Sequence, residues 1–250
     1  MARRGQKKHL KRLPAPKYWP IKRKEAKFTT RPIPGPHPKD HSLTLAIVLR
    51  EMLGYAKNMR EVKAILNTGQ VRVDGRIRKD PRFPIGMMDV LEIQDSEEKF
   101  RLVPKKKGGL RLVPIDDKEA SFKLCRVEKK MMVPGGRLQM TLHDGRNLLL
   151  PSGGKPADFN TLDTIQVSLP DQKHIKTIPM EKGSYAVVSQ GKNIGIEGKI
   201  LEIEKRFGTH ASTVTIEDAE GNRFQTALGY VFVLGKKTSE VTTDSGGASQ

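Results

Sequence analysis

A short amphipathic helix joined to a basic hairpin, within residues 54–79, constrains the fold more than any other stretch of the sequence. Apolar side chains recur at steps of three and four residues between Met59 and Leu66, which is typical of a helix with one buried face. Asn58 precedes this run as an N-cap, and Gly69 follows it as a helix terminator. We therefore expect one helix face in a core and the cations of the other face in water.

A β-hairpin is predicted directly after this helix, because Asp74-Gly75 suits a two-residue turn in which both residues adopt positive φ. Apolar and cationic side chains alternate on either side of the turn, so one face of the hairpin is expected in the core and the other in solvent. The apolar members are Val71, Val73 and Ile77, and the cationic members are Arg72, Arg76 and Arg78.

Residues 1–40 form a basic, proline-rich arm. They contain 13 Lys or Arg against two carboxylates, and so contribute +11 of the net charge of +18. Seven prolines between Pro14 and Pro38 favour extended backbone, so the arm is expected to be disordered alone and to become ordered along the surface of a partner. Trp19, the one tryptophan, has two interpretations: it stacks on a nucleic-acid base, or it packs on the body of the protein.

Clustered cations indicate a polyanionic partner, because cations within about 8 to 10 Å of one another act as one electrostatic field. Contacts with the phosphates of RNA fit this pattern. A cationic tip, Lys105-Lys106-Lys107, lies between the similar segments 100–104 and 110–114, which predict a hairpin. In the arm the predicted RNA contacts are Arg3, Arg4, Lys7, Lys8, His9, Lys11, Arg12, Lys17, Trp19, Lys22, Arg23 and Lys24.

The chain is predicted to be a multi-domain α+β protein, since 250 residues exceed one ordinary domain. Ser42 is expected to cap a first helix that extends to Leu53. Short strands at regular spacing then indicate sandwich or barrel architecture. The predicted order is an extended basic arm (1–41), a small α+β module (42–94), a strand-rich central domain (95–180), a five-stranded barrel (181–235) and a disordered tail (236–250).

Candidate catalytic and metal-binding residues each have a simpler interpretation. His143-Asp144-Gly145 lies between two alternating segments and predicts a hairpin turn. His37 and His41 are separated by a proline and have no third ligand nearby, so no metal site is expected. Residues 191–198 lack the Gly-Lys-Ser/Thr sequence and following helix of a phosphate-binding loop, so they predict a turn between strands.

Cys125 is the only cysteine, so no intrachain disulfide can form and a reducing, cytosolic setting is expected. Its apolar neighbours indicate a core residue. No apolar run approaches the roughly 20 residues of a membrane span, and the amino terminus lacks the apolar core of a signal peptide. We therefore predict no catalytic residue, no metal or other cofactor, no small-molecule substrate and no membrane partner.

The order of these segments resembles small ribosomal subunit protein four of the archaeal and eukaryotic type over nearly the whole chain. The resemblance implies an RNA-binding module over residues 42–94 and a KOW motif in an SH3-like barrel that begins near Gly183. The Thr- and Ser-rich segment after Lys237 differs from the basic segment of eukaryotic members and looks archaeal. The matching segments are 7–13, 31–37, 71–78, 83–90, 123–127, 143–147 and 191–198.

The resemblance also implies a function and a set of contacts. We expect a structural, non-catalytic constituent of the small ribosomal subunit in the cytoplasm, bound to small-subunit ribosomal RNA and to neighbouring ribosomal proteins. The alternatives are an RNA-binding accessory protein, a KOW-type translation or transcription factor, and part of an RNA-modifying enzyme, since the same module is found appended to pseudouridine synthases. The implied RNA contacts are Lys57, Asn58, Arg60, Lys63, Arg72, Arg76, Arg78 and Lys79 in the module, and Gly191, Lys192, Asn193 and Gly195 in the barrel.

Overall fold

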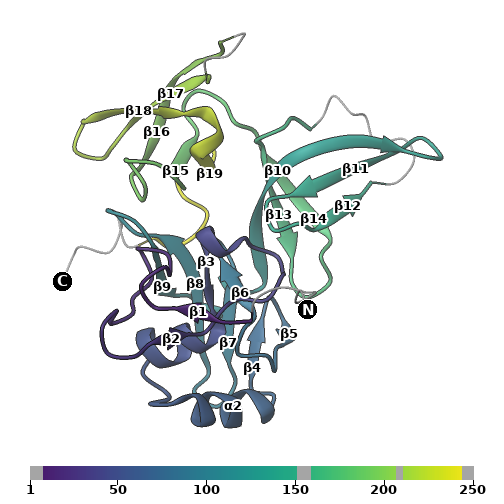
Figure 1. Ribbon diagram of the computed structural model, residues 1–250. Coiled ribbons are helices and arrows are strands. Elements are labelled where there is room, and N and C mark those ends of the chain that lie inside the picture. The colour runs from purple at the N-terminus through teal and green to yellow at the C-terminus, as the bar shows by residue number, and fades with distance from the viewer. Residues whose placement is uncertain (1–7, 151–158, 207–210, 244–250) are drawn as a thin grey trace, which may run out of the picture.

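The computed structural model describes residues 8–150, 159–206 and 211–243, and its ribbon has three lobes (Figure 1). The described part is a strand-rich α+β protein with few helices, as predicted. Three five-stranded antiparallel sheets form most of it. Within the described residues, no helix combines the length and the apolar character that a membrane span requires.

The first sheet lies beside helix α2 at the foot of Figure 1 and has the strand order β5-β4-β7-β8-β9. Because β7 pairs with β8, this sheet continues across residue 94, so the division of the chain into domains there stays a prediction. The strands are β4 (Val71–Val73), β5 (Arg76–Ile77), β7 (Val90–Ile93), β8 (Glu98–Pro104) and β9 (Leu110–Pro114).

The first predicted helix begins later than expected. Ser42 does not cap it, because Ser42 pairs with Gly86 in a two-stranded sheet and its Oγ donates to the carbonyl of Pro38 at 2.9 Å. The helix begins at Leu45 and is fully buried through Leu49. The elements here are η1 (Lys39–His41), β3 (Ser42–Thr44), α1 (Leu45–Ile47), the π-helical turn η2 (Val48–Met52) and β6 (Pro84–Gly86).

The second predicted helix is confirmed as α2 (Met59–Asn67). The Asn58 side-chain oxygen accepts the backbone N–H groups of Arg60 at 2.9 Å and Glu61 at 3.1 Å. Gly69 follows the helix with φ +82°, which glycine adopts without strain. Local sequence chemistry therefore fixes both ends of this helix.

The predicted hairpin is confirmed with one correction. Asp74 and Gly75 have φ of 51° and 72°, as the two-residue turn between β4 and β5 requires. Val71 and Val73 are buried. Ile77, which the alternation predicts to be in the core, is 50% exposed because β5 is a two-residue strand at the sheet edge.

The arm is ordered from residue 8 onward, which corrects the expectation of disorder. Its strands β1 (Leu10–Lys11) and β2 (Phe28–Thr29) pair with each other. Trp19 is 3% exposed, lies in the core of the first sheet, and donates from Nε1 to the carbonyl of Ser42 at 2.9 Å. Of the two interpretations of Trp19, the structure therefore supports packing on the protein, because a buried indole cannot stack on a base.

The second sheet has the order β12-β11-β10-β13-β14, and the third β18-β17-β16-β15-β19. The first predicted strand of this unit is confirmed as β15, which begins at Tyr185. The last predicted strand is confirmed as β19, which begins at Val231, one residue later than predicted. Helix α3 (Asp117–Ala120) precedes the second sheet, whose strands are β10 (Phe122–Val133), β11 (Arg137–Leu142), β12 (Asn147–Leu149), β13 (Thr164–Ser168) and β14 (His174–Ile178). The strands of the third sheet are β15 (Tyr185–Val188), β16 (Glu197–Glu204), β17 (Thr213–Glu217), β18 (Arg223–Ala227) and β19 (Val231–Gly235), and the 3-10 turn η4 (Leu228–Tyr230) joins the last two.

The carboxy-terminal segment covers part of a core that all three sheets share. Buried Phe232 of the third sheet lies in one apolar cluster with Val103 of β8 and Leu124 of β10. Val241 joins this cluster at 4% exposure, and Thr243 Oγ1 donates to Glu197 Oε2 at 2.6 Å. The expectation of a disordered tail is therefore wrong for residues 236–243, because this segment buries apolar surface. Residues 244–250 lie outside the described part.

A buried charge cluster joins the hairpin to the second sheet. Lys123 on β10 is fully buried, and its Nζ lies 3.0 Å from Asp74 Oδ2 and 3.0 Å from Asp144 Oδ2. It also contacts the carboxylate of Asp89. Arg146 pairs with both Asp74 and Asp144, with its Nε 3.1 Å from Asp144 Oδ2. Since Asp74 forms the hairpin turn, the cluster holds that turn against the second sheet.

The charged forms in this cluster are stabilised despite burial. Burial alone would lower the pKa of Lys123, but the surrounding carboxylates outweigh it and raise that pKa well above its usual value. Burial also opposes ionisation of Asp144, yet Lys123 and its other cationic neighbours hold the pKa of Asp144 at about 2. The pKa of Asp89 is lowered as well, because His37 and Lys123 outweigh the effect of burial.

Replacing Lys123 with Met tests this cluster. The variant keeps the length of the side chain but leaves the buried carboxylates with too few cations, so we expect the free energy of unfolding to fall by about 3–5 kcal/mol. Chemical denaturation at neutral pH measures the loss. Lys173→Met is the control, because Lys173 is 80% exposed and should change stability by less than about 1 kcal/mol. Equal, small losses in both variants would contradict the role given to Lys123.

Gly75 allows a second close contact between the hairpin and the second sheet. A Cβ at this position would lie 2.9 Å from Pro170 Cβ, in the turn between β13 and β14. We expect Gly75→Ala to cost more than the about 1–2 kcal/mol of backbone strain at positive φ, because Pro170 must also move. Gly221→Ala is the matched control, since Gly221 has φ +81° and open space around its Cα. Thermal unfolding compares the two, and equal losses would exclude the Pro170 contact.

Candidate nucleic-acid interface

The exposed face of α2 carries the first group of predicted cations. Val62 and Leu66 bury the opposite face, while Arg60 and Lys63 lie in solvent together with Lys57, which precedes the helix. Their side chains have no hydrogen-bond or ion-pair partner within the described residues. Asn58, also a predicted contact, differs: its side chain caps α2 and also donates to Glu61 Oε1 at 2.5 Å, so its polar groups are already used.

The hairpin cations divide by exposure. Arg76 and Lys79 are exposed, and Arg72 and Arg78 are half-buried. The Arg78 guanidinium lies over the ring of Phe83, 4.3 Å from its centroid. Burial lowers the pKa of Arg78, and the neighbouring charge of Arg76 lowers it further. These cations repel one another, so an anion at the hairpin would relieve their repulsion.

Two predicted contacts in the arm instead hold the arm together. Arg12 is 7% exposed and donates to the carbonyls of Lys22 at 2.5 Å and Phe28 at 3.2 Å. Arg23 donates from Nη2 to the carbonyl of Pro16 at 2.8 Å, and from Nη1 to three more carbonyls. We therefore assign structural roles to Arg12, Arg23 and the buried Trp19, in place of the RNA contacts predicted from the sequence. Exposed arm residues are Lys8, His9, Lys11, Lys17, Lys22 and Lys24, whereas Arg3, Arg4 and Lys7 lie outside the described residues.

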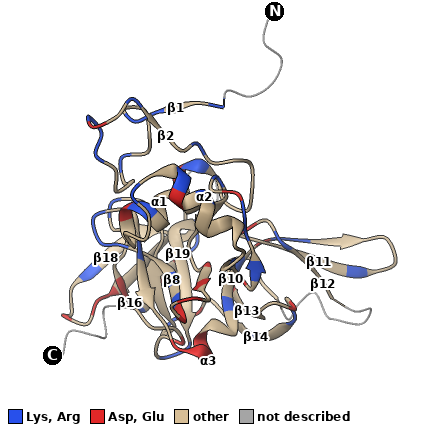
Figure 2. Cartoon of the chain, turned by 90° about the horizontal axis from the view of Figure 1, so that it is seen from below, with Lys and Arg blue, Asp and Glu red and all other residues tan. Residues whose placement is uncertain are grey.

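The structure brings the arm and α2 together around one cationic groove, which we call the arm–helix groove. It encloses about 380 Å³, and no carboxylate lines it among the described residues. Of the five cations that line this groove, the sequence predicted Lys8 and Lys63 as RNA contacts but not Arg31, Arg50 or Arg82. The density of cations in the arm was a usable signal for Arg31. The cations that line the groove are Lys8, Arg31, Arg50, Lys63 and Arg82. In Figure 2, blue segments follow the arm near β1 and β2 and the helices beside them.

A second cationic region forms where the glycine-rich turn meets the tip of the β8–β9 hairpin. Gly195 is buried against this tip, and a Cβ there would lie 2.4 Å from the backbone nitrogen of Lys106. Asn193 Nδ2 donates to the carbonyl of Gln225 at 3.2 Å, so it braces the turn. A Cβ at Gly191 would lie 3.1 Å from Cδ2 of the Tyr230 ring. The exposed cations of this region are Lys105, Lys106, Lys107 and Lys192.

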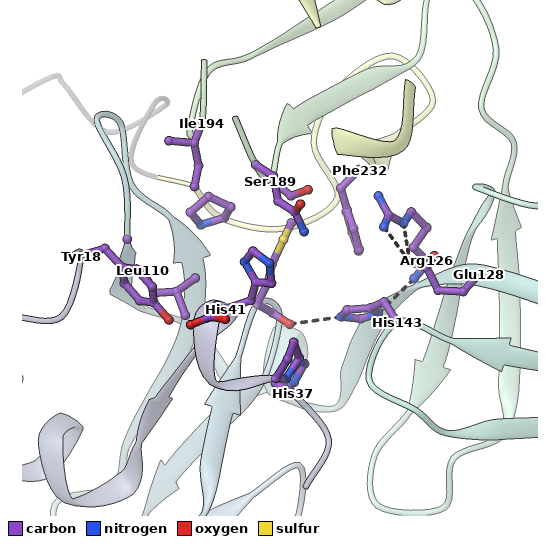
Figure 3. Close-up of a pocket in the computed structure, with 16 residues that line it drawn as sticks. Tyr18, His37, His41, Leu110, Arg126, Glu128, His143, Ser189, Ile194 and Phe232 are labelled. Carbon is purple, nitrogen blue, oxygen red and sulfur yellow. Dashed lines mark hydrogen bonds and ion pairs between the residues drawn. The ribbon is translucent and has the colours of Figure 1, made fainter. Parts of the chain in front are cut away.

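A cavity of about 190 Å³ marks the junction of the arm and the three sheets (Figure 3). Arg126 on β10 donates to the carbonyls of Gly229 at 2.7 Å and Val231 at 3.0 Å, which ties the second sheet to the third. His143 lies beside it, and its Nδ1 accepts the backbone N–H of Arg126 at 3.3 Å while Nε2 donates to the carbonyl of Met87 at 3.3 Å. The polar groups of Arg126 and His143 in this cavity are thus largely engaged in hydrogen bonds that hold parts of the fold together.

Cys125, His143 and Asp144 place three possible metal-ligand atoms within 4.8 Å of one another, the one such group in the described chain. Their donors are already engaged. Burial raises the pKa of the Cys125 thiol, which keeps it protonated. Asp144 pairs with Lys123 and Arg146, and both ring nitrogens of His143 have backbone partners. This chemistry fits a packed structural junction better than a metal site.

Protonation of His143 is unfavourable in the folded protein. Burial, followed by the charge of Lys123, lowers its pKa from 6.5 to about 3, and a proton on Nδ1 would face the N–H of Arg126. Above pH 6.5, neutral His143 makes its full contribution to the free energy of unfolding. This contribution is lost as pH falls toward 3, because the unfolded chain binds a proton on this histidine at a higher pH than the folded protein does.

We therefore expect the free energy of unfolding in urea to decrease between pH 7.5 and 5, and His143→Gln to flatten that decrease. His9→Gln, at an exposed position in the arm, should leave the slope unchanged. The same pH slope in wild type and His143→Gln would contradict the assignment.

Three family models match separate parts of the sequence. The RS4NT (NUC023) domain matches residues 4–40, the S4 domain matches residues 44–91, and the ribosomal family S4e matches residues 96–174. The three matches follow the arm, the helix-and-hairpin region, and the second sheet with the β8–β9 hairpin.

Similar proteins match over most of their length. The small ribosomal subunit protein eS4 of Staphylothermus marinus is 47% identical over 95% of this chain and 96% of its own. That of Methanocaldococcus jannaschii is 42% identical over 94% of this chain and 97% of its own. The crystal structure of the 30S ribosomal protein S4e from Thermoplasma acidophilum superimposes with a TM-score of 0.67 at 34% identity, and covers 80% of this chain and 99% of that one. The chain therefore belongs to the S4e family of small ribosomal subunit proteins.

Proposed function

We propose that this chain is a structural constituent of the small ribosomal subunit that binds folded ribosomal RNA through phosphate and shape contacts. The observation that carries this proposal is the set of unpaired cations on α2 and the hairpin. Elsewhere on the surface, cations such as Lys99, Lys182 and Arg223 lie within 4.0 Å of a carboxylate. Cations left without a carboxylate are available to the phosphates of an external polyanion.

The shape of the interface supports RNA over an unstructured polyanion. Arg60 and Lys63 project from α2, whose opposite face is buried, and Arg76 follows the turn that the Lys123 cluster holds, so the spacing of these cations is fixed before binding. A fixed spacing matches the phosphates of one folded RNA better than those of a flexible chain, because shape and backbone contacts dominate recognition of structured RNA. We propose Lys57, Arg60, Lys63, Arg76 and Lys79 as the central contacts.

Further features of the proposal concern the other units. We propose that the third sheet is an SH3-like KOW barrel and that its turn at Lys192 acts together with the tip at Lys105, Lys106 and Lys107. The close approach of Gly195 to this tip supports a joint RNA contact. Neighbouring ribosomal proteins are proposed as additional partners, and the cytoplasmic ribosome as the location. The chain acts as scaffold, without catalysis.

Replacing Lys57, Arg60 and Lys63 together with Gln tests the proposed function. Each lost phosphate contact lowers the slope of log affinity against log salt by about 0.7 to 0.9, so the triple variant should lower it by about 2 to 3 and weaken binding to small-subunit ribosomal RNA. Filter binding over a salt series gives both quantities.

The matched control replaces three paired cations, Lys173, Lys182 and Arg223, with Gln. Both variants lose the same formal charge, so an effect of net charge alone would be equal in the two. Equal changes in slope would therefore contradict a localised interface.

A further inference from the structure

An aromatic ring stands exposed within the arm–helix groove. Phe28 on β2 lines the groove and is 49% exposed, although large aromatic side chains are usually buried. The His9 ring lies 5.6 Å from the Phe28 ring, tilted by 45°, and Lys27 Nζ lies 5.6 Å from the Phe28 centroid. Phe28 therefore has neighbours that position it, while about half of the residue stays exposed.

Hydroxyl groups lie beside this ring. Thr29 and Thr30 also line the groove, and Thr29 Oγ1 is buried with no hydrogen-bond partner among the described residues. Buried polar atoms normally have a partner, so this hydroxyl is available to a ligand group that reaches it. The groove volume of about 380 Å³ lies within the about 300–1,000 Å³ typical of sites for small groups.

The groove thus combines three features that a nucleotide needs. Cations suit its phosphate, an exposed aromatic ring suits its base, and free hydroxyl groups suit its sugar or base edges. A phosphate alone would use the cations but leave Phe28 exposed. An acidic protein segment would also leave the ring without a matching surface, whereas every nucleobase has a π face.

We propose that the arm–helix groove holds one unstacked nucleotide of RNA, with its base stacked on Phe28 and its phosphate between Lys8 and Lys63. This inference rests on the proposed function, because it specifies how the same RNA is held at one point. The other proposed contacts with RNA are electrostatic and weaken with salt. Stacking on Phe28 would add one contact whose strength does not depend on salt. It would also fix the position of the RNA along the groove.

Phe28→Ala tests the stacking contact. Loss of one base–aromatic stack corresponds to a loss of affinity for small-subunit ribosomal RNA of about 5- to 150-fold, with an unchanged salt slope, because no charge is removed. Phe28→Tyr should restore the affinity, since the ring remains. Leu13→Ala is the matched control, because Leu13 is an apolar residue of the same arm, 72% exposed and outside the groove, and it should bind like wild type.

A polyanion without bases separates stacking from charge. Inorganic polyphosphate should bind wild type and Phe28→Ala equally, because it offers phosphates but no base to stack. Equal weakening toward polyphosphate and RNA in both Phe28→Ala and Phe28→Leu would overturn the proposal. Phe28→Leu keeps an apolar side chain in β2 and serves if the Ala variant loses the β1–β2 pairing; it should lose RNA affinity in the same way.

The outcomes distinguish this inference from the proposed function. Full RNA affinity in both Phe28→Ala and Phe28→Leu, with weakened binding in the α2 triple variant, overturns the stacked nucleotide and leaves the proposed function intact. Absence of RNA binding by the wild-type chain would overturn both.

Discussion

The fully buried Lys123 ammonium, in contact with Asp74, Asp89 and Asp144, is the interaction on which the rest of the structure depends. Each carboxylate comes from a different turn or strand, so one side chain of the second sheet fixes three segments. Such a cluster adds little net stability compared with an apolar core, but it is strongly unfavourable when incomplete. It therefore specifies one arrangement of the hairpin against the second sheet and disfavours others.

The candidate interface depends on that arrangement. Arg76 and Arg78 follow the turn that Lys123 and Pro170 contact. The second sheet therefore fixes the positions of these two arginines, although they belong to the first sheet and its hairpin. The arm is held in a similar way, because buried Trp19 and the carbonyl contacts of Arg23 fix its path beside α2. Cations from three segments far apart in sequence thus meet on surfaces whose geometry is set before any RNA is bound.

Local sequence chemistry predicted much of this fold. Asn58, Gly69 and Asp74-Gly75 act on their immediate neighbours, so the cap, the helix end and the turn could be inferred and are confirmed. Ser42 was misassigned because its strand partner, Gly86, lies far along the chain and competes with the capping role. Arg12, Arg23 and Trp19 look like RNA contacts in sequence, and only the folded arm shows that carbonyls and the core already use them. Pairing between distant residues has no local signal, which is also why the Lys123 cluster could not be foreseen.

The central claim is that the hairpin is held rigidly by the second sheet before RNA binds. Amide hydrogen exchange of the free protein tests this claim most directly at Asp74, whose N–H donates to the carbonyl of Val90 at 2.9 Å, and at Val90, whose N–H donates to Asp74 Oδ1 at 3.0 Å. We expect these two amides to exchange as slowly as those in the middle of β10, through global unfolding, and RNA to add no further protection. Fast exchange by local opening in the free protein, followed by protection when RNA is added, would contradict it.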